Sequence, residues 1–163
     1  MAERYKVRVT KDHLVFCSGH FISYEGDRCE RLHGHNYRTA VEVEGGLDVN
    51  YYVFDFIALK NLMKAITDYL DHRMMLPTRN PHINVKEQGR SIHVLYRDRE
   101  WLFPREDCVL LPIENTTAEM LARYIAQRLL EELRRQHQFE PEVMRVEVEE
   151  NIGQSATYEW RPE

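Results

Sequence analysis

Two segments of this chain have the three- and four-residue spacing of apolar side chains that is typical of an amphipathic helix. The first follows Asp55, a favourable N-cap residue, and reaches Leu70. The second follows the Thr-Thr-Ala-Glu sequence of residues 116–119, which matches a capping box, and continues toward Leu133. The rest of the chain has to supply a surface that buries both apolar stripes.

Strand-like segments flank both helices. Residues 5–15 and 37–43 are rich in Val, Thr and Tyr, and residues 143–150 alternate between polar and apolar side chains ahead of a shorter segment at 157–160. This order predicts an α+β fold in which a four-stranded antiparallel sheet carries both helices on one face. The other face is then left for neighbouring copies to cover, and a closed oligomeric β-barrel is one solution.

The length of 163 residues suits a single domain over residues 1–163 with one hydrophobic core. Apolar residues on both sides of a charged turn at 97–100 predict an extra hairpin near residues 82–111. We find no internal repeat. One domain with one core predicts one main functional site.

The composition argues against two kinds of partner. The net charge of −5, without a long run of Lys and Arg, disfavours nucleic-acid binding. No apolar window of about eighteen residues exists, and residues 1–6 lack the apolar core of a signal peptide, so we expect a cytoplasmic protein that does not bind membranes. The three cysteines, Cys17, Cys29 and Cys108, have no paired spacing, which predicts reduced thiols.

Three histidines give the strongest chemical signal. His33 and His35 open the second strand two residues apart, so both imidazoles are expected on one face, and Gly34 between them allows close approach of another backbone. His20 ends the first strand, the natural antiparallel neighbour. Three neutral imidazoles with one open coordination position are typical of catalytic zinc, whereas structural zinc usually has four protein ligands. A Zn²⁺ ion held by His20, His33 and His35 is therefore one interpretation of the pattern. A His-x-His pair taken alone is more often explained by surface or hydrogen-bonded histidines, so the choice depends on the residues around it.

The segment Cys-Glu-Arg-Leu-His-Gly-His-Asn-Tyr, from Cys29 to Tyr37, resembles the signature of the 6-pyruvoyltetrahydropterin / 6-carboxytetrahydropterin synthase family. The similarity covers most of the chain apart from the middle hairpin, with further matches at residues 16–20, 53–56, 70–72 and 115–119 and at Glu150. It implies the tunnelling fold (T-fold) and a homo-oligomer, a hexamer built as a dimer of trimers with sites at the subunit interfaces. The implied substrate is 7,8-dihydroneopterin triphosphate.

The resemblance also implies catalytic roles. Cys29 matches the catalytic base of the family, and a nearby metal ion together with Arg28 and Arg31 would favour its thiolate. Asp71 and His72 match a proton-transfer pair, in which a carboxylate orients an imidazole and tunes its pKa. Outside this pattern, the same pair would be merely the polar end of a helix.

Three residues are implied in substrate binding. Glu150 matches the residue that anchors the pterin through two parallel hydrogen bonds. On an alternating strand, Glu150 also shares the apolar face of Val146 and Val148, where a carboxylate without a partner is costly. Thr116 and Thr117 match positions near the pterin, although helix capping would explain them equally well.

Three functions are compatible with these residues. The three residues between Cys29 and His33 resemble the bacterial 6-carboxytetrahydropterin synthases of queuosine and 7-deazaguanine synthesis, zinc-dependent lyases that release acetaldehyde and triphosphate. The first alternative is a 6-pyruvoyltetrahydropterin synthase, which eliminates triphosphate in a tetrahydrobiopterin-type pathway. The second alternative is a zinc- and pterin-binding protein without turnover.

Overall fold

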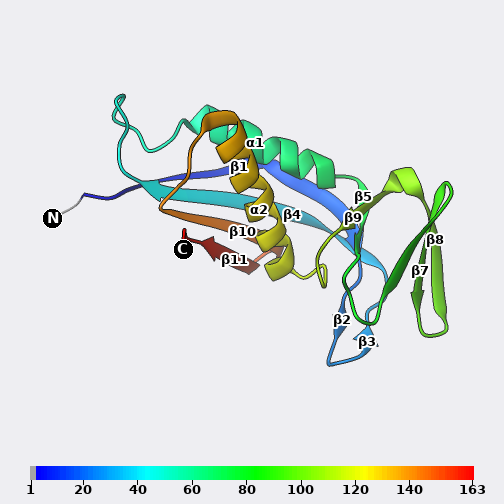
Figure 1. The fold of residues 1–163 in the computed structure, drawn as a ribbon. Helices are drawn as coiled ribbons and strands as arrows, with labels where there is room; N and C mark the ends of the chain where they lie inside the picture. Colours follow the sequence, from blue (N-terminus) through cyan, green and yellow to red (C-terminus); the bar gives the residue numbers. More distant parts are fainter. Residues whose placement is uncertain (1–2) are drawn as a thin grey trace.

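The computed structural model describes residues 3–163, so Met1 and Ala2 of the N-terminal stretch discussed above lie outside it. A six-stranded sheet forms the centre of the fold, and two helices cover one of its faces (Figure 1). The strands lie in the order β11 (Gln154–Trp160), β10 (Val143–Asn151), β4 (His33–Gly45), β1 (Tyr5–His20), β5 (Arg73–Pro77) and β9 (Cys108–Leu111).

The four predicted strands form the antiparallel part of this sheet, from β11 to β1. β1 contains a bulge and continues beyond the strand-like segment of residues 5–15 to His20, the predicted end of this strand. Thr10 pairs with Ala40 whereas Val15 pairs with Arg38, so β1 advances five residues while β4 advances two. A bulge interrupts the alternation of side chains that the sequence pattern relies on, and the strand resumes toward His20.

The prediction of a four-stranded antiparallel sheet is wrong in strand number and in direction. β5 pairs with β1 in parallel, and β9 pairs with β5 in parallel, so the sheet is mixed. Met75, Leu76, Val109 and Leu111 in these strands are almost completely buried. Strands that are buried on both faces read as short continuous apolar runs without alternation, which explains why the period of two failed to identify them.

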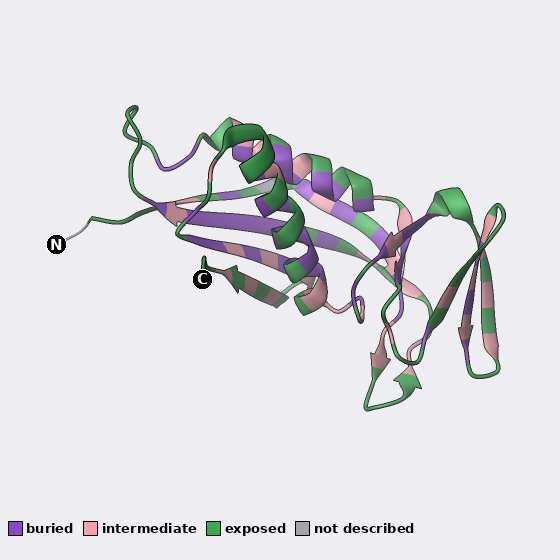
Figure 2. Cartoon of the chain, viewed as in Figure 1, coloured by how far each residue is buried: buried purple, intermediate pink, exposed green. Residues whose placement is uncertain are grey.

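Both predicted helices form on the same side of the sheet. α1 (Phe56–Leu70) begins after Asp55, whose carboxylate accepts a hydrogen bond of 2.6 Å from the Ala58 N–H. α2 (Ala118–His137) is capped by Thr117, whose hydroxyl accepts from the Met120 N–H at 3.4 Å. Figure 2 shows buried residues where the helices meet the sheet and largely exposed ones along the edge strand β11. Within the described residues, no helix is long and apolar enough to cross a membrane.

A second, smaller sheet forms in the segment where a hairpin was expected. It contains three antiparallel strands, β6 (Asn84–Gln88), β7 (Ser91–Tyr96) and β8 (Arg99–Pro104), and a 3₁₀ turn (Arg105–Asp107) leads from it to β9. Its apolar face shares a buried cluster with Phe21, which directly follows β1. The short hairpin of β2 (Ser23–Tyr24) and β3 (Arg28–Cys29) lies next to this sheet (Figure 1).

Candidate metal and substrate site

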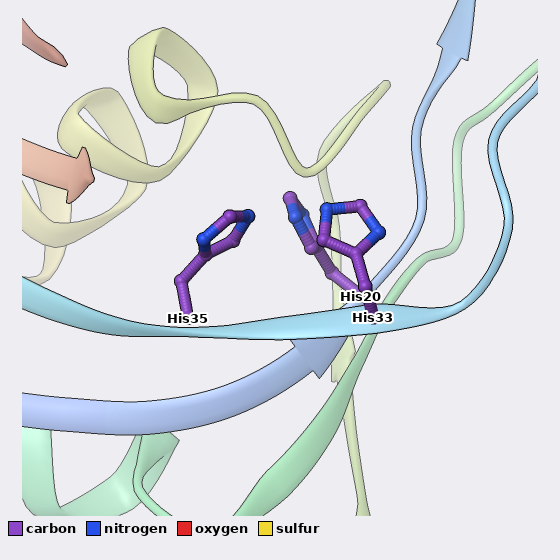
Figure 3. Close-up of side chains that lie close together, drawn as sticks. All are labelled: His20, His33 and His35. Atoms are coloured by element: carbon purple, nitrogen blue, oxygen red, sulfur yellow. The ribbon is translucent and has the colours of Figure 1, made fainter.

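The pairing of β1 with β4 brings the three predicted metal ligands together. His20 lies opposite His33, and Ser18 lies opposite His35, so all three imidazoles project from neighbouring positions at one end of the sheet. One ligand atom from each ring lies within 4.8 Å of the other two. Figure 3 shows the rings converging on a common space. The three histidines can therefore hold a metal ion.

His20 is prepared as a ligand by its surroundings. Its ring is 1% exposed, and its Nδ1 lies 3.0 Å from the Thr116 carbonyl oxygen, which can only accept, so Nδ1 carries the proton. Burial lowers the pKa of His20 to about 4, although the hydrogen bond to Thr116 opposes this change. The ring is therefore neutral at pH 7, and its Nε2 lone pair is free to bind a metal.

His33 has the same arrangement on the neighbouring strand. Its Nδ1 donates to the Arg31 carbonyl oxygen at 2.8 Å, which leaves Nε2 as the potential ligand atom. The ring centroids of His33 and His35 are 4.9 Å apart and nearly perpendicular. A carbonyl that fixes the tautomer of a histidine is a common feature of metal sites, because it orients the ring before the metal binds.

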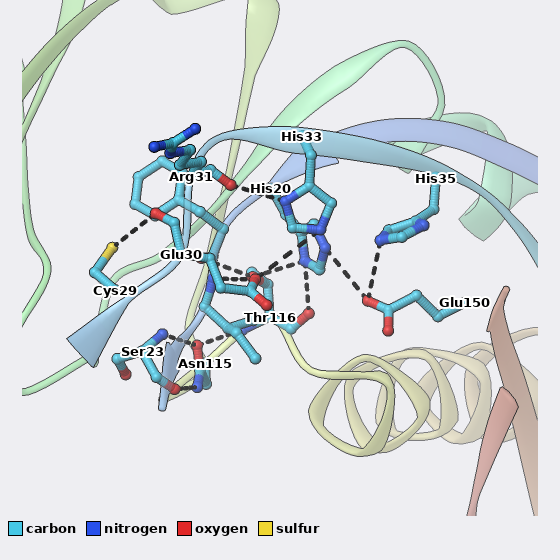
Figure 4. A network of polar contacts seen from close by, with 12 residues as sticks. His20, Ser23, Cys29, Glu30, Arg31, His33, His35, Asn115, Thr116 and Glu150 are labelled. Atoms are coloured by element: carbon cyan, nitrogen blue, oxygen red, sulfur yellow. Dashed lines mark hydrogen bonds and ion pairs between the residues drawn. The ribbon is translucent and has the colours of Figure 1, made fainter. Parts of the chain in front are cut away.

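Glu150, at the end of β10, lies against the histidines. Its Oε1 is 3.3 Å from Nε2 of His20 and 3.7 Å from Nε2 of His35 (Figure 4). The Tyr37 hydroxyl lies 3.5 Å from the same oxygen as a donor. Nε2 of His20 is buried and, among residues 3–163, has no hydrogen-bond partner. The Glu150 carboxylate oxygen and the unprotonated Nε2 of His20 are both acceptors, so neither can donate a hydrogen bond to the other. Neither atom supplies a proton or a positive charge to stabilise their proximity. A cation bound at Nε2 of His20 would supply positive charge next to this carboxylate, so the residues present fit a metal ion held by the histidines.

Gly34 allows the two strands that carry the histidines to lie close together. A Cβ added at this position would lie 3.0 Å from the Ser18 carbonyl oxygen on β1. Such a contact is too short for a side chain unless the backbone moves. The need for close approach that the sequence suggested at Gly34 is confirmed.

Gly34→Ala is therefore expected to lower the free energy of unfolding by about 1–3 kcal/mol, because the added methyl group has to push β1 and β4 apart. Gly46→Ala is the matched control, since an added Cβ there meets no atom of residues 3–163 within 4 Å. Chemical denaturation of both variants measures the difference. Equal stability of Gly34→Ala and the unmodified protein would show that the strands separate at this point without cost.

The side chains of Cys29, the last residue of β3, and Glu30, the next residue, point in different directions. The Cys29 thiol donates to the Glu30 carbonyl oxygen at 3.5 Å, and burial raises its pKa despite the nearby positive charge of Arg99. The Glu30 carboxylate instead lies toward the histidines, with Oε2 4.0 Å from Nε2 of His33 and 3.3 Å from the Ile22 N–H (Figure 4). Glu30 is thus a candidate catalytic residue that the sequence prediction missed.

A signal for Glu30 was present in the sequence. Successive residues of an extended segment direct their side chains to opposite sides, so only one of Cys29 and Glu30 is expected to face a given site. Glu30 also stands three residues before His33. The choice between the two residues nevertheless depends on how the loop turns, which the local sequence does not specify.

Asp71 and His72 form the expected pair at the end of α1. Nδ1 of His72 lies 2.8 Å from Oδ2 of Asp71, and the other carboxylate oxygen accepts from the Cys17 N–H at 2.7 Å. Partial burial raises the pKa of Asp71, but these hydrogen bonds outweigh it and hold the pKa below its ordinary value. Among the described residues, neither side chain hydrogen-bonds to the three histidines, and the His72 side chain is 82% exposed. The pair faces outward from the chain.

Thr116 and Thr117 have separate structural tasks. Thr116 is fully buried, and its carbonyl and hydroxyl oxygens lie 3.0 Å and 3.2 Å from Nδ1 of His20. Thr117 caps α2. The capping-box pattern would have made Thr116 the cap, so the helix begins one residue later than that pattern indicates. A contact of either residue with a pterin stays a prediction.

Comparison with known sequences identifies similar proteins. A family model described as 6-pyruvoyl tetrahydropterin synthase matches residues 8–161. A Methanocaldococcus jannaschii protein, provisionally named 6-carboxy-5,6,7,8-tetrahydropterin synthase, is 34% identical over 146 residues, which cover 89% of each chain. The 6-carboxy-5,6,7,8-tetrahydropterin synthase of Haemophilus influenzae is 29% identical over 127 residues, covering 75% of this chain and 81% of that protein.

The fold is similar to solved structures of 6-pyruvoyltetrahydropterin synthase from Plasmodium vivax. They superpose with a TM-score of 0.90 at 30% identity, covering 99% of this chain and 100% of that chain. Two of these structures are of variants in which a catalytic glutamate is replaced, by alanine in one and by cysteine in the other. The coverage means that the smaller sheet β6–β8 lies within the region of structural similarity.

Proposed function

Because this chain belongs to the 6-pyruvoyl tetrahydropterin synthase family, we propose that it is a zinc-dependent lyase that converts 7,8-dihydroneopterin triphosphate to 6-carboxy-5,6,7,8-tetrahydropterin. Acetaldehyde and triphosphate are the other products. The single observation that supports this most is the buried neutral His20. It directs toward His33, His35 and a carboxylate a nitrogen that has no hydrogen-bond partner in the described part of the chain. Three imidazoles with an open position suit a catalytic metal ion rather than a structural one.

The protein side chains around the metal position have distinct tasks. His20, His33 and His35 hold the ion, which when bound supplies Lewis acidity to the hydroxyl-bearing side chain of the substrate. Glu150 accepts hydrogen bonds from the amino group and an adjacent ring N–H of the pterin. Because this carboxylate lies 3.3 Å from a histidine ligand, a pterin bound to it is held close to the metal.

Proton transfer requires a base that reaches the substrate side chain. We assign this task to Glu30, because its carboxylate lies on the histidine side of the loop, whereas the Cys29 thiol bonds to a backbone carbonyl. The catalytic glutamate of the Plasmodium vivax relatives is consistent with a carboxylate in this role. Partial burial raises the pKa of the Cys29 thiol, which disfavours the thiolate that a base would need.

The outward-facing Asp71–His72 pair suits a site that is shared between subunits. The His72 imidazole is 82% exposed, yet the Asp71 carboxylate holds it at 2.8 Å. It is therefore oriented to contact a group that belongs to another subunit or to a substrate bound there. We propose that the pair completes the site of a neighbouring copy in a hexamer built as a dimer of trimers. Size-exclusion chromatography with light scattering tests this assembly, and a monomer at working concentrations would contradict it.

The product distinguishes the leading function from the second candidate, a 6-pyruvoyltetrahydropterin synthase, which the high similarity to the Plasmodium vivax structures favours. The zinc-loaded protein is incubated with 7,8-dihydroneopterin triphosphate, without an added reductase, and the products are identified by mass spectrometry. We expect acetaldehyde and the 6-carboxy pterin. A 6-pyruvoyl pterin would establish the second candidate, and unchanged substrate with zinc bound would exclude turnover of this compound.

A further inference from the structure

A single arginine of the smaller sheet binds the loop that carries Glu30. Nη1 of Arg99 donates to the Cys29 carbonyl oxygen at 3.2 Å, and Nη2 donates to the Glu30 carbonyl oxygen at 3.1 Å. Successive carbonyl groups of a regular strand point in opposite directions. One guanidinium that reaches both therefore marks a bend at Glu30, directly after β3 ends at Cys29.

The position of Arg99 is fixed by aromatic side chains. Its guanidinium lies over the Trp101 ring, 4.7 Å from the centroid, and 5.9 Å from the centroid of Tyr96. Trp101 stacks in turn on Phe21, with a centroid distance of 4.5 Å. Since Phe21 follows the metal ligand His20 in the chain, the same stack connects the loop to the end of β1.

Further contacts hold the chain on both sides of β3. The Tyr96 hydroxyl donates to the Asp27 carbonyl oxygen, and Arg97 forms an ion pair with the Asp27 carboxylate. At the other end, the Glu30 N–H donates to the Ile22 carbonyl oxygen at 3.0 Å. Arg99 connects the smaller sheet to the carbonyl groups of Cys29 and Glu30.

We propose that Arg99 is a positioning residue: by holding the carbonyl groups of Cys29 and Glu30, it turns the Glu30 carboxylate, rather than the Cys29 thiol, toward His33. The inference rests on the proposed function only where Glu30 is assigned proton transfer. The smaller sheet is then a clamp on the catalytic loop. A lysine cannot replace the arginine, because one ammonium lacks the planar fork that spans two acceptors.

The clamp is tested first without any substrate. Arg99→Met keeps an apolar stem over Trp101 but removes all donors, and Arg90→Met, in the turn before β7, is the matched control. Hydrogen–deuterium exchange of the zinc-loaded variants is followed by mass spectrometry. We expect exchange in peptides covering residues 22–32 to become about tenfold faster in Arg99→Met only, with peptides of α1 and α2 unchanged. Unchanged exchange in residues 22–32 would overturn the clamp.

Activity then tests positioning. Arg99→Met is expected to lower kcat by about 10- to 100-fold, since a displacement of about 1 Å at a catalytic group costs up to that much. KM and zinc content should stay near those of the unmodified enzyme, and millimolar guanidinium or methylguanidine should restore part of kcat. Full kcat in Arg99→Met would overturn the positioning role.

The two measurements separate the two claims. If the unmodified protein does not turn over 7,8-dihydroneopterin triphosphate but residues 22–32 loosen in Arg99→Met, the proposed function fails and the clamp stands. If the unmodified protein is active and the loop exchanges equally in both variants, the proposed function stands and the clamp fails. Exchange that increases across the whole chain, with a lower melting temperature, would contradict a local role, and Arg99→Lys then tests whether charge alone restores the fold.

Discussion

Replacing His33 with alanine is expected to lower the affinity of the protein for zinc by more than about 100-fold, because loss of an outer partner of a metal ligand already costs about 10- to 100-fold. The three ligand atoms lie within 4.8 Å of one another, so removal of one leaves two imidazoles for the ion. His33 suits this test better than His20. Its side chain is 38% exposed whereas that of His20 is 1% exposed, so the truncation leaves no large buried cavity.

Zinc retained after gel filtration, together with titration using a chromophoric chelator, measures the loss of affinity. His82→Ala is the matched control, because His82 is exposed and does not belong to the three-histidine cluster. The control should bind zinc like the unmodified protein. Stoichiometric zinc in His33→Ala at unchanged affinity would remove His33 from the ligand set.

The second large effect is expected at Glu30. Glu30→Gln keeps the size and shape of the side chain but removes the ionised carboxylate, so we expect kcat to fall by about 10²- to 10⁴-fold, the usual contribution of a general base. KM for 7,8-dihydroneopterin triphosphate should change little, because Glu150 rather than Glu30 is proposed to anchor the pterin. Steady-state kinetics on the zinc-loaded variant, with product identified by mass spectrometry, measures both constants.

Two further variants make this result specific. Glu25→Gln alters a carboxylate in the neighbouring turn that pairs with Arg28 on the surface, and it should have little effect. Cys29→Ala compares the two candidate bases directly, and we expect a much smaller loss than in Glu30→Gln. The reverse order, with Cys29→Ala inactive and Glu30→Gln active, would assign the base to Cys29 and refute the role proposed for Glu30.

The fold was predictable where the pattern is local. Asp55 and the Thr-Thr pair before α2 mark the helix starts to within a residue, since capping depends only on the first turn. The alternation over residues 143–150 is recovered in β10. β5 and β9 were missed because each has at most five residues and is largely buried, which gives neither a period of two nor a helical period.

The sequence by itself determined which three histidines form the candidate metal site. Two histidines lie two residues apart with a glycine between them, and a third histidine ends the neighbouring strand. Because side chains alternate along a strand, antiparallel pairing in this register brings the three imidazoles together on one face. The same alternation assigned Glu150 to the apolar face, and this residue lies against the histidines. Each of these features follows from the alternation of side chains within one strand.

Tertiary structure alone decided which groups face the metal position and which face outward. Glu30 rather than Cys29 lies toward His33 because Arg99, about seventy residues later in the chain, holds both carbonyl groups. The His20 tautomer depends on the Thr116 carbonyl, and the outward orientation of His72 depends on where α1 ends beside β1. Hydrogen bonds between distant segments leave no periodic trace in a sequence, since each partner is an ordinary residue until the fold brings the two together.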